Sequence, residues 1–139
     1  MKILIDTNVI LDYLLCREPY QEDAKMIINA CKEKKVIGCI AAHTVSNIFF
    51  ILRKVYSVKE RRDILNSICQ LFEVESINKE KIIRGLNNDK FSDFEDCLQM
   101  ECAISFQAEY IVTRNIDDFK GSSIACILPS DLLDKFGDI

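Results

Sequence analysis

The sequence has few of the residues that interrupt secondary structure or build special loops. Only four glycines and two prolines occur in 139 residues, and the hydrophobic content of 49% is ordinary, which excludes a disordered or low-complexity chain. No segment matches G-x-x-x-x-G-K-[ST] or G-x-G-x-x-G, so nothing supports nucleotide binding through those loops. The length suits one hydrophobic core and is too short for two, which predicts a single domain over residues 1–139.

The signals of secreted and membrane proteins are also missing. Asp6 and Asp12 interrupt the apolar start, and no run of about 18 apolar residues follows. The seven cysteines include no C-x-x-C pair, which fits neither a closed disulfide framework nor a cysteine-rich zinc site. We therefore expect a cytoplasmic protein with reduced thiols and no membrane contact.

Positive charge is scarce, with a net charge of -4, which argues against binding nucleic acid by bulk electrostatics. One basic cluster surrounds Tyr56 and consists of Arg53, Lys54, Lys59, Arg61 and Arg62. Three interpretations stay open for this cluster: it could follow an RNA backbone, pair with an acidic partner, or form a solvated helix face.

Short apolar strands alternate with amphipathic helices along the chain. Strands are expected over residues 1–6, 36–41, 72–74, 110–112 and 124–128. Helices are expected over residues 9–15, 19–34, 45–55, 57–71, 78–86 and 93–107, and from 129 onward, with Ser57 and Ser92 as N-caps. A turn with a short helix should cover 113–119. This alternation predicts an α/β fold with three α/β/α layers around a central parallel sheet of about five strands.

Acidic and polar residues gather where the strands of this sheet would end. They are Asp6 and Thr7 after the first strand, and Thr113, Arg114, Asn115, Asp117 and Asp118 after the fourth. The carboxyl ends of neighbouring parallel strands open onto one edge, so these residues should converge. Asp93 and Asp96, three apart on one helix face, could join them. Carboxylates held together repel one another, and Mg²⁺ or Mn²⁺ relieves that repulsion.

Each of these residues also has a plainer explanation. Asp93 and Glu95 suit the first turn of a helix, where acids complement the helix dipole. Asp6 could cap the next helix, and Asp118 could be a turn residue. His43 is the only histidine and should lie at the same edge, where capping or a polar network explains it better than general-base catalysis.

Three segments, in this order and at this spacing, resemble the motifs of the PIN-domain family. That family comprises metal-dependent ribonucleases and includes the VapC-type toxins of bacterial and archaeal toxin-antitoxin modules. The segments are Leu4–Asp12, Asp93–Gln99 and Ile111–Phe119, and the resemblance extends over nearly the whole chain.

The resemblance implies a role for individual residues. The catalytic set would be Asp6, Asp96 and Asn115, with Asp118 as a nearby alternative to Asn115. The metal ligands would be Asp6 and Asp96, with Asp93 as a further carboxylate. The pocket would be lined by Thr7, Asn47, Thr113 and Arg114, with Arg114 beside the scissile phosphate. Apart from the resemblance, the basic cluster around Tyr56 makes Arg53, Lys54, Arg61 and Arg62 the candidates for RNA binding, if that cluster follows an RNA backbone.

One position departs from the family pattern. The segment His43–Phe49 resembles the second motif of the family, but Asn47 stands where the family usually has Glu. An amide can coordinate a metal through its oxygen but brings no charge, so the site should depend more on Asp6, Asp96 and Asp93.

These observations predict an endoribonuclease that uses Mg²⁺ or Mn²⁺ to hydrolyse RNA phosphodiester bonds and acts as the toxin of a type II toxin-antitoxin module. Its partners would be an RNA substrate, an antitoxin protein and, by family habit, a second copy in a homodimer. The alternative is a PIN-like RNA- or protein-binding module with a weakened or inactive metal site. Phosphoryl transfer of the haloacid dehalogenase type is disfavoured, because that reaction usually needs a second Asp where Asn8 stands.

Overall fold

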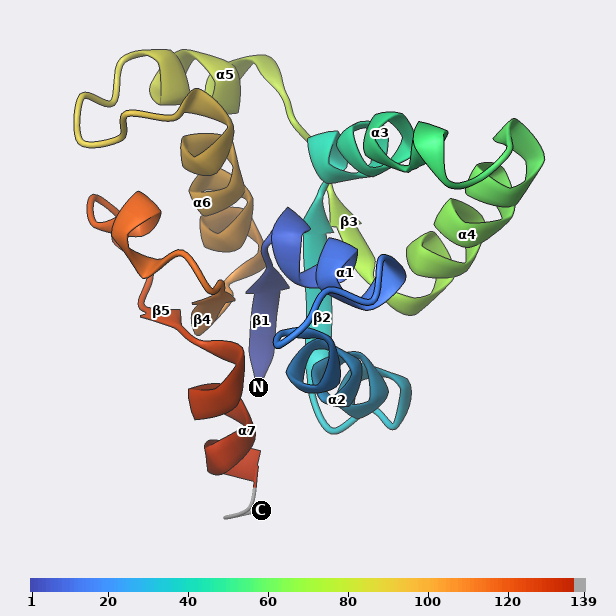
Figure 1. Ribbon diagram of the computed structural model, residues 1–139. Helices are drawn as coiled ribbons and strands as arrows, with labels where there is room; N and C mark the ends of the chain where they lie inside the picture. The colour runs from blue at the N-terminus through green and yellow to red at the C-terminus, as the bar shows by residue number, and fades with distance from the viewer. Residues whose placement is uncertain (137–139) are drawn as a thin grey trace.

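The structure is a computed structural model that describes residues 1–136, and its strands and helices alternate along the chain (Figure 1). The strands are β1 (Lys2–Ile5), β2 (Ile37–Ala41), β3 (Glu73–Glu75), β4 (Tyr110–Val112) and β5 (Cys126–Ile127). The α-helices are α1 (Thr7–Leu14), α2 (Gln21–Lys32), α3 (Ala42–Ile51), α4 (Val58–Leu71), α5 (Lys79–Leu86), α6 (Phe94–Phe106) and α7 (Pro129–Phe136). Two 3₁₀ turns are η1 (Leu52–Lys54) and η2 (Ile116–Phe119).

The five strands form one parallel sheet in the order β3-β2-β1-β4-β5, which confirms the predicted fold class. β1 is the central strand, and its Leu4 pairs with Cys39 of β2 and with Ile111 of β4. Both faces of a parallel sheet are covered by helices, which is why the inner strands β1, β2 and β4 are predominantly apolar, whereas the edge strand β3 is Glu-Val-Glu. Asp6 follows β1 directly and therefore lies at the middle of the carboxyl edge.

Helices cover the two faces of the sheet as separate layers. Ile3 and Ile5 of β1 point into a core shared with α1, α2, α4 and α7, whereas Leu4 points into a second core with Cys97 and Met100 of α6. This division follows from the two-residue period of a strand, which sends successive side chains to opposite faces. Figure 1 shows α1 beginning at the tip of β1, while α6 lies beside the sheet with α5 packed against it.

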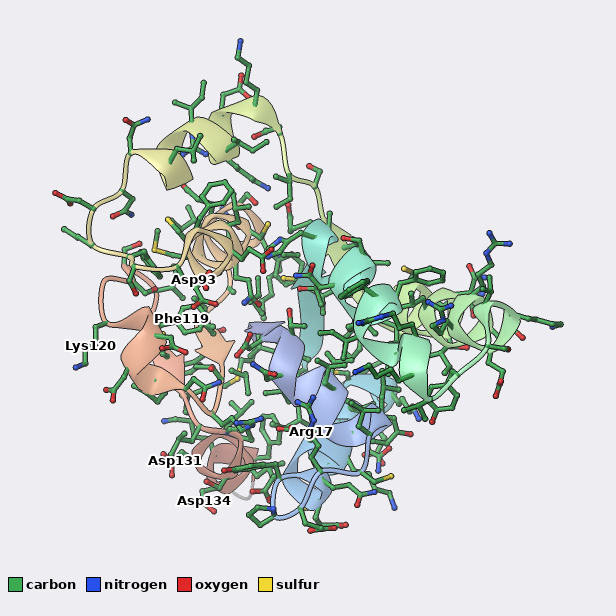
Figure 2. The ribbon with its side chains drawn as sticks, turned by 45° about the horizontal axis from the view of Figure 1, so that its top comes forward. Arg17, Asp93, Phe119, Lys120, Asp131 and Asp134 are labelled. Atoms are coloured by element: carbon green, nitrogen blue, oxygen red, sulfur yellow. The ribbon has the colours of Figure 1, made fainter. Side chains whose placement is uncertain are left out.

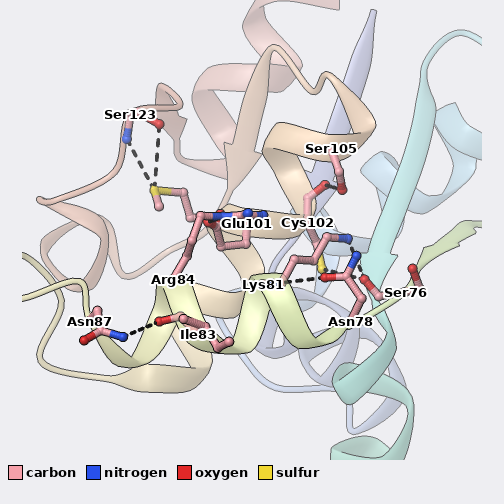
Figure 3. A network of polar contacts seen from close by, with 11 residues as sticks. Ser76, Asn78, Lys81, Ile83, Arg84, Asn87, Glu101, Cys102, Ser105 and Ser123 are labelled. Carbon is pink, nitrogen blue, oxygen red and sulfur yellow. Dashed lines mark hydrogen bonds and ion pairs between the residues drawn. The ribbon is translucent and has the colours of Figure 1, made fainter.

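Polar contacts fix α6 against α5, as Figure 3 shows. Arg84 Nε donates to Glu101 Oε1 at 2.7 Å, which pairs a carboxylate that is 6% exposed. The buried Lys81 donates to the Ser76 carbonyl oxygen at 2.5 Å and lies 3.4 Å from the Glu75 carboxylate. Because a buried charge is costly unless it is paired, the Arg84–Glu101 pair ties α6 to α5, and the Lys81 contacts tie α5 to the end of β3 and the residue after it.

Several element boundaries differ from the prediction. α1 begins at Thr7 rather than two residues later, and α3 begins at Ala42, which brings His43 into a helical first turn. The predicted N-cap Ser92 is wrong, because Asp93 is the cap and its Oδ1 accepts from the Asp96 backbone N–H at 3.0 Å. Ser57 is confirmed as the cap of α4.

The thiols and the helix lengths can be read directly from the structure. All seven cysteines carry free thiols, and Cys31, Cys39, Cys97 and Cys102 are buried. Among the helices of residues 1–136, none combines the length and the apolar character needed to cross a membrane.

Candidate active site

A hollow of about 400 Å³ opens at the carboxyl edge of the sheet, where α1, α3 and α6 begin. We call it the acidic pocket, because its wall includes the side chains of Asp6, Asp93, Glu95, Asp96 and Asp118. The rest of the wall is formed by Thr7, Asn8, Leu11, His43, Asn47, Phe50, Ile51 and Gln99. No lysine or arginine belongs to this wall within the described chain.

Asp6 is the most deeply placed acid of the pocket, with 4% of its surface exposed. Both carboxylate oxygens are held: Gln99 Nε2 donates to Oδ1 and Thr113 Oγ1 donates to Oδ2, each at 2.9 Å. Burial raises the pKa of Asp6, and these two hydrogen bonds act in the opposite direction. Asp6 occupies the N-cap position of α1 without a well-formed side-chain capping hydrogen bond, although the backbone N–H groups of Thr7 and Asn8 at the start of α1 also act to lower its pKa.

Asp96 in the first turn of α6 shows the electrostatic cost of gathering these acids. Burial raises its pKa to about 7, with further increases from the charges of Asp93, Asp6 and Asp118. A hydrogen bond from Gln99 lowers it in part. The Asp96 carboxylate is therefore poised either to hold a proton or to accept a cation near neutral pH.

Asp93 has a structural role at the pocket wall, since its Oδ1 caps α6. Figure 2 shows Asp93 at the start of α6, beside the segment that carries Phe119 and Lys120. The plainer explanation of Asp93 as a helix-start residue is thus correct. Its position in the wall also leaves it available to a metal through the other oxygen.

Gln99 was missed by the sequence reasoning. It is 3% exposed, its Nε2 is bonded to Asp6, and its Oε1 has no hydrogen-bond partner. The signal that could have found it is its spacing, because residue 99 lies three after Asp96 and so on the same helix face. A buried amide oxygen without a partner at the wall of an acidic pocket is a free ligand for a cation or a water.

His43 lies at the expected edge of the sheet and belongs to the pocket wall. Its Nδ1 is buried without a hydrogen-bond partner. Burial lowers the pKa of His43, while the nearby charges of Glu95 and Asp93 act to raise it. The net direction is downward, so the imidazole is neutral at neutral pH.

Asn47 and Glu95 meet across the pocket mouth. Asn47 Nδ2 donates to Glu95 Oε2 at 3.3 Å, which joins α3 to the first turn of α6. Asn47 belongs to the wall of the acidic pocket. Glu95 was explained by the helix dipole alone, and its partner on another helix could not be seen from sequence spacing.

Three residues predicted for the site do not belong to the pocket wall: Thr113, Arg114 and Asn115. Arg114 turns away to Asp12, with Nε–Oδ2 and Nη2–Oδ1 distances of 2.8 and 3.3 Å, and its guanidinium lies 4.3 Å from the Tyr20 ring centroid. The buried Asp12 carboxylate needs a charged partner, and this requirement decides the Arg114 orientation. Asn115 lines a neighbouring hollow with Asp118, and its backbone N–H donates to Thr113 Oγ1 at 3.0 Å.

The predicted RNA-binding residues lie on η1 and α4, at one end of the pocket. Arg53 stacks on the Phe50 ring at 3.7 Å, and Phe50 lines the pocket. Arg61 donates to the Phe49 carbonyl oxygen at 2.9 Å, so its guanidinium is partly used within the fold. Lys54 and Arg62 are exposed.

The donor set of the pocket fits a hard divalent cation. Within residues 1–136, no three His, Cys, Asp or Glu side chains lie close enough to hold a metal ion as they stand. Mutual repulsion keeps carboxylates apart, and a cation would draw Asp6 and Asp96 together. The unpartnered Gln99 Oε1 adds a neutral oxygen ligand of the kind that Mg²⁺ and Mn²⁺ accept.

Comparison with known proteins identifies the family. A family model described as "PIN domain" matches residues 2–117. No curated protein matches the chain. Among solved structures, a toxin-antitoxin complex from Klebsiella pneumoniae is 21% identical with a TM-score of 0.68, covering 91% of this chain and 97% of that one.

Two further solved structures have the same fold. VapBC-1 from nontypeable Haemophilus influenzae is 15% identical with a TM-score of 0.68, covering 94% of this chain and 99% of that chain. The Sarcin-Ricin loop cleaving toxin VapC20 from Mycobacterium tuberculosis is 13% identical with a TM-score of 0.61. The match covers 78% of this chain and 86% of that chain. These identities show a shared fold, and the family model covers most of the sequence, so the chain belongs to the PIN domain family.

Proposed function

We propose that this protein is an endoribonuclease that depends on Mg²⁺ or Mn²⁺ and hydrolyses RNA phosphodiester bonds. The observation that carries the proposal is the held carboxylate of Asp6, which faces Asp96 in a pocket wall without lysine or arginine. Membership of the PIN domain family supports nuclease chemistry at this position. When bound, a divalent ion polarises the scissile phosphate and activates a water molecule for attack.

Each acid has a separate task in this proposal. Asp6 would be the fixed ligand, because its hydrogen bonds from Gln99 and Thr113 set its orientation before the cation arrives. Asp96 would be the second ligand and would release its proton on loading. Asp118, at the other side of the pocket, would accept a hydrogen bond from the attacking water and orient it.

RNA would approach over the end of the pocket formed by α3 and η1. Phe50 is 61% exposed there and offers a ring on which a base can stack, while Arg53 beside it offers a charge for the backbone. Lys54 and Arg62 would extend this basic track. Arg114 is excluded from the track because it is paired with Asp12.

We further propose that the protein acts in the cytoplasm as the toxin of a type II toxin-antitoxin module, with an antitoxin as partner and a homodimer as the assembly. The Klebsiella pneumoniae structure of the same fold is a toxin-antitoxin complex, which supports this assignment. The alternative is a PIN-like binding module with a weakened site, which the amide at Asn47 favours. Metal binding that depends on Asp6 and Asp96 separates the two.

The test is RNA cleavage by the purified protein and by Asp6→Asn, each with Mn²⁺ and each with EDTA. The parent should cut RNA with Mn²⁺ and stop in EDTA, whereas Asp6→Asn should be inactive and still folded by circular dichroism. Asp131→Asn, in the first turn of α7, changes the net charge equally and should cut like the parent. Equal cleavage by Asp6→Asn and the parent would refute the proposal and would point to a contaminating nuclease.

A further inference from the structure

The acidic residue that the second PIN motif usually supplies is replaced by an amide, and the structure brings another carboxylate to the same place. Asn47 projects from the second turn of α3 into the acidic pocket. Its Nδ2 donates to Glu95 Oε2 at 3.3 Å, and Glu95 belongs to the same wall. The negative charge absent from α3 is therefore present at the tip of the Asn47 side chain, contributed by α6.

The amide is the chemical group that allows this exchange. A carboxylate at position 47 would repel Glu95, because two like charges cannot share a hydrogen bond unless one is protonated. An asparagine offers two N–H donors and so holds the Glu95 carboxylate by one oxygen, leaving the other oxygen unbound. Asn47 thus acts as a positioning residue for a neighbouring acid.

An independent feature shows that the pocket is built for a ligand. Gln99 is 3% exposed, and its Oε1 has no hydrogen-bond partner although its Nε2 is bonded to Asp6. A buried amide oxygen is costly to leave unpaired, and it lies in the wall that Glu95 and Asp96 share. A divalent cation or its bound water satisfies such an oxygen.

We propose that Glu95 supplies the missing acidic function of this site: it binds the divalent cation, directly or through a water, while Asn47 holds it in place. This inference rests on the proposed function, since it assigns a further residue to the same metal site. It also explains how the site can keep its negative charge although Asn47 is uncharged. Glu95 on α6 supplies the carboxylate that α3 lacks.

The test measures Mn²⁺ binding to the full-length protein by isothermal titration calorimetry, so that it does not depend on RNA cleavage. Glu95→Gln should weaken Mn²⁺ binding about tenfold or more, as expected for one unit charge near a divalent ion. Glu22→Gln is the matched control, because Glu22 is an exposed glutamate in the first turn of α2 and lies outside the pocket wall. It should leave the affinity unchanged.

A double variant tests whether the carboxylate can be supplied from either helix. In Asn47→Glu with Glu95→Gln, the carboxylate and the amide trade places across the same contact, and this protein should regain most of the Mn²⁺ affinity that Glu95→Gln loses. Thermal unfolding of each variant shows whether it is folded. A double variant that stays as weak as Glu95→Gln would overturn the inference.

The other outcomes separate this inference from the function on which it rests. If Glu95→Gln binds Mn²⁺ as well as Glu22→Gln does, while Asp6→Asn does not bind it, the role of Glu95 is refuted and the metal site remains. If the parent and Asp6→Asn give the same titration, the proposed metal-dependent function fails as well.

Discussion

The Asp96 carboxylate should destabilise the metal-free protein, and Asp96→Asn should therefore make it more stable. Its pKa is raised from 3.8 to about 7 by burial and by the charges of Asp93, Asp6 and Asp118. Below pH 3.8 the group is protonated in both the folded and the unfolded chain and has no effect. As the pH rises toward 7 the unfolded chain ionises first, so stability falls and the loss is complete above the folded pKa.

The size of the effect can be worked out from these values. A pKa of about 7 instead of 3.8 corresponds to roughly 4 kcal/mol above neutral pH. Asp96 is only half-buried, and screening by solvent reduces this to about 1–2 kcal/mol. Asp96 also lies in the first turn of α6, where losing a negative charge costs about 0.3–1 kcal/mol. The net gain from Asp96→Asn should be about 1 kcal/mol.

Urea unfolding in EDTA measures this gain. Asp96→Asn should be more stable than the parent near about pH 8, and the difference should shrink as the pH falls and nearly vanish below about pH 3, where the unfolded chain is also largely protonated. Asp131→Asn loses a first-turn acid of α7 without like-charged neighbours in a pocket, and it should be slightly less stable than the parent at the higher pH.

Adding Mn²⁺ should reverse the order of stabilities. At a hundred times its dissociation constant, a ligand adds about 2.7 kcal/mol to the folded state that binds it, and Asp96→Asn should not bind. If Asp96→Asn behaves like Asp131→Asn in EDTA and loses stability near about pH 8, the crowding of acids in this pocket is not a source of strain. The inference that the negative charge of Asp96 destabilises the metal-free protein would then be refuted.

Three further predictions follow from individual contacts. Thr113→Val removes the hydroxyl that donates to Asp6 Oδ2 and should lower Mn²⁺ affinity in titration calorimetry about 10–100-fold with an unchanged circular dichroism spectrum; unchanged affinity would contradict it. Arg114→Met leaves the buried Asp12 with Arg17 at 3.7 Å as its remaining partner, and should lower the free energy of unfolding in urea by about 2 kcal/mol without changing Mn²⁺ affinity. Mn²⁺ affinity should rise with pH up to about 7, where Asp96 loses its proton; a flat profile between about pH 5 and 8 would argue against Asp96 as a ligand.

The sequence predicted the fold and the centre of the pocket because both follow from simple periodicities. Apolar runs of strand length alternating with amphipathic helices leave few arrangements other than a covered parallel sheet. In such a sheet, residues that follow different strands meet at one edge. Asp6 and Asp118 were expected together by this rule and Asp96 by its place in the first turn of a helix, and all three belong to one pocket wall in the structure.

The errors concern side chains whose direction is decided by a partner far away in the sequence. Arg114 was expected beside the pocket because it follows Thr113 in the chain, but it pairs with Asp12 of α1. Gln99 and Glu95 lie within a motif that was recognised for its aspartates, and their contacts with Asp6 and Asn47 join segments that are separated by 93 and 48 residues. Spacing within one helix contains no information about such partners.

The charge of the pocket determines the order in which a cation and RNA can bind. A phosphate that enters the wall of Asp6, Asp93, Glu95 and Asp118 meets like charges, and each of the three exposed ones costs about 1 kcal/mol at roughly 4 Å, where solvent screens it. Arg114 cannot offset them, because Asp12 already neutralises it. The phosphate can therefore enter only after a divalent cation has reversed this repulsion. It follows that RNA should bind more tightly with Mn²⁺ than without it, whereas a module that binds RNA only through Arg53 and its neighbours would bind equally well in EDTA.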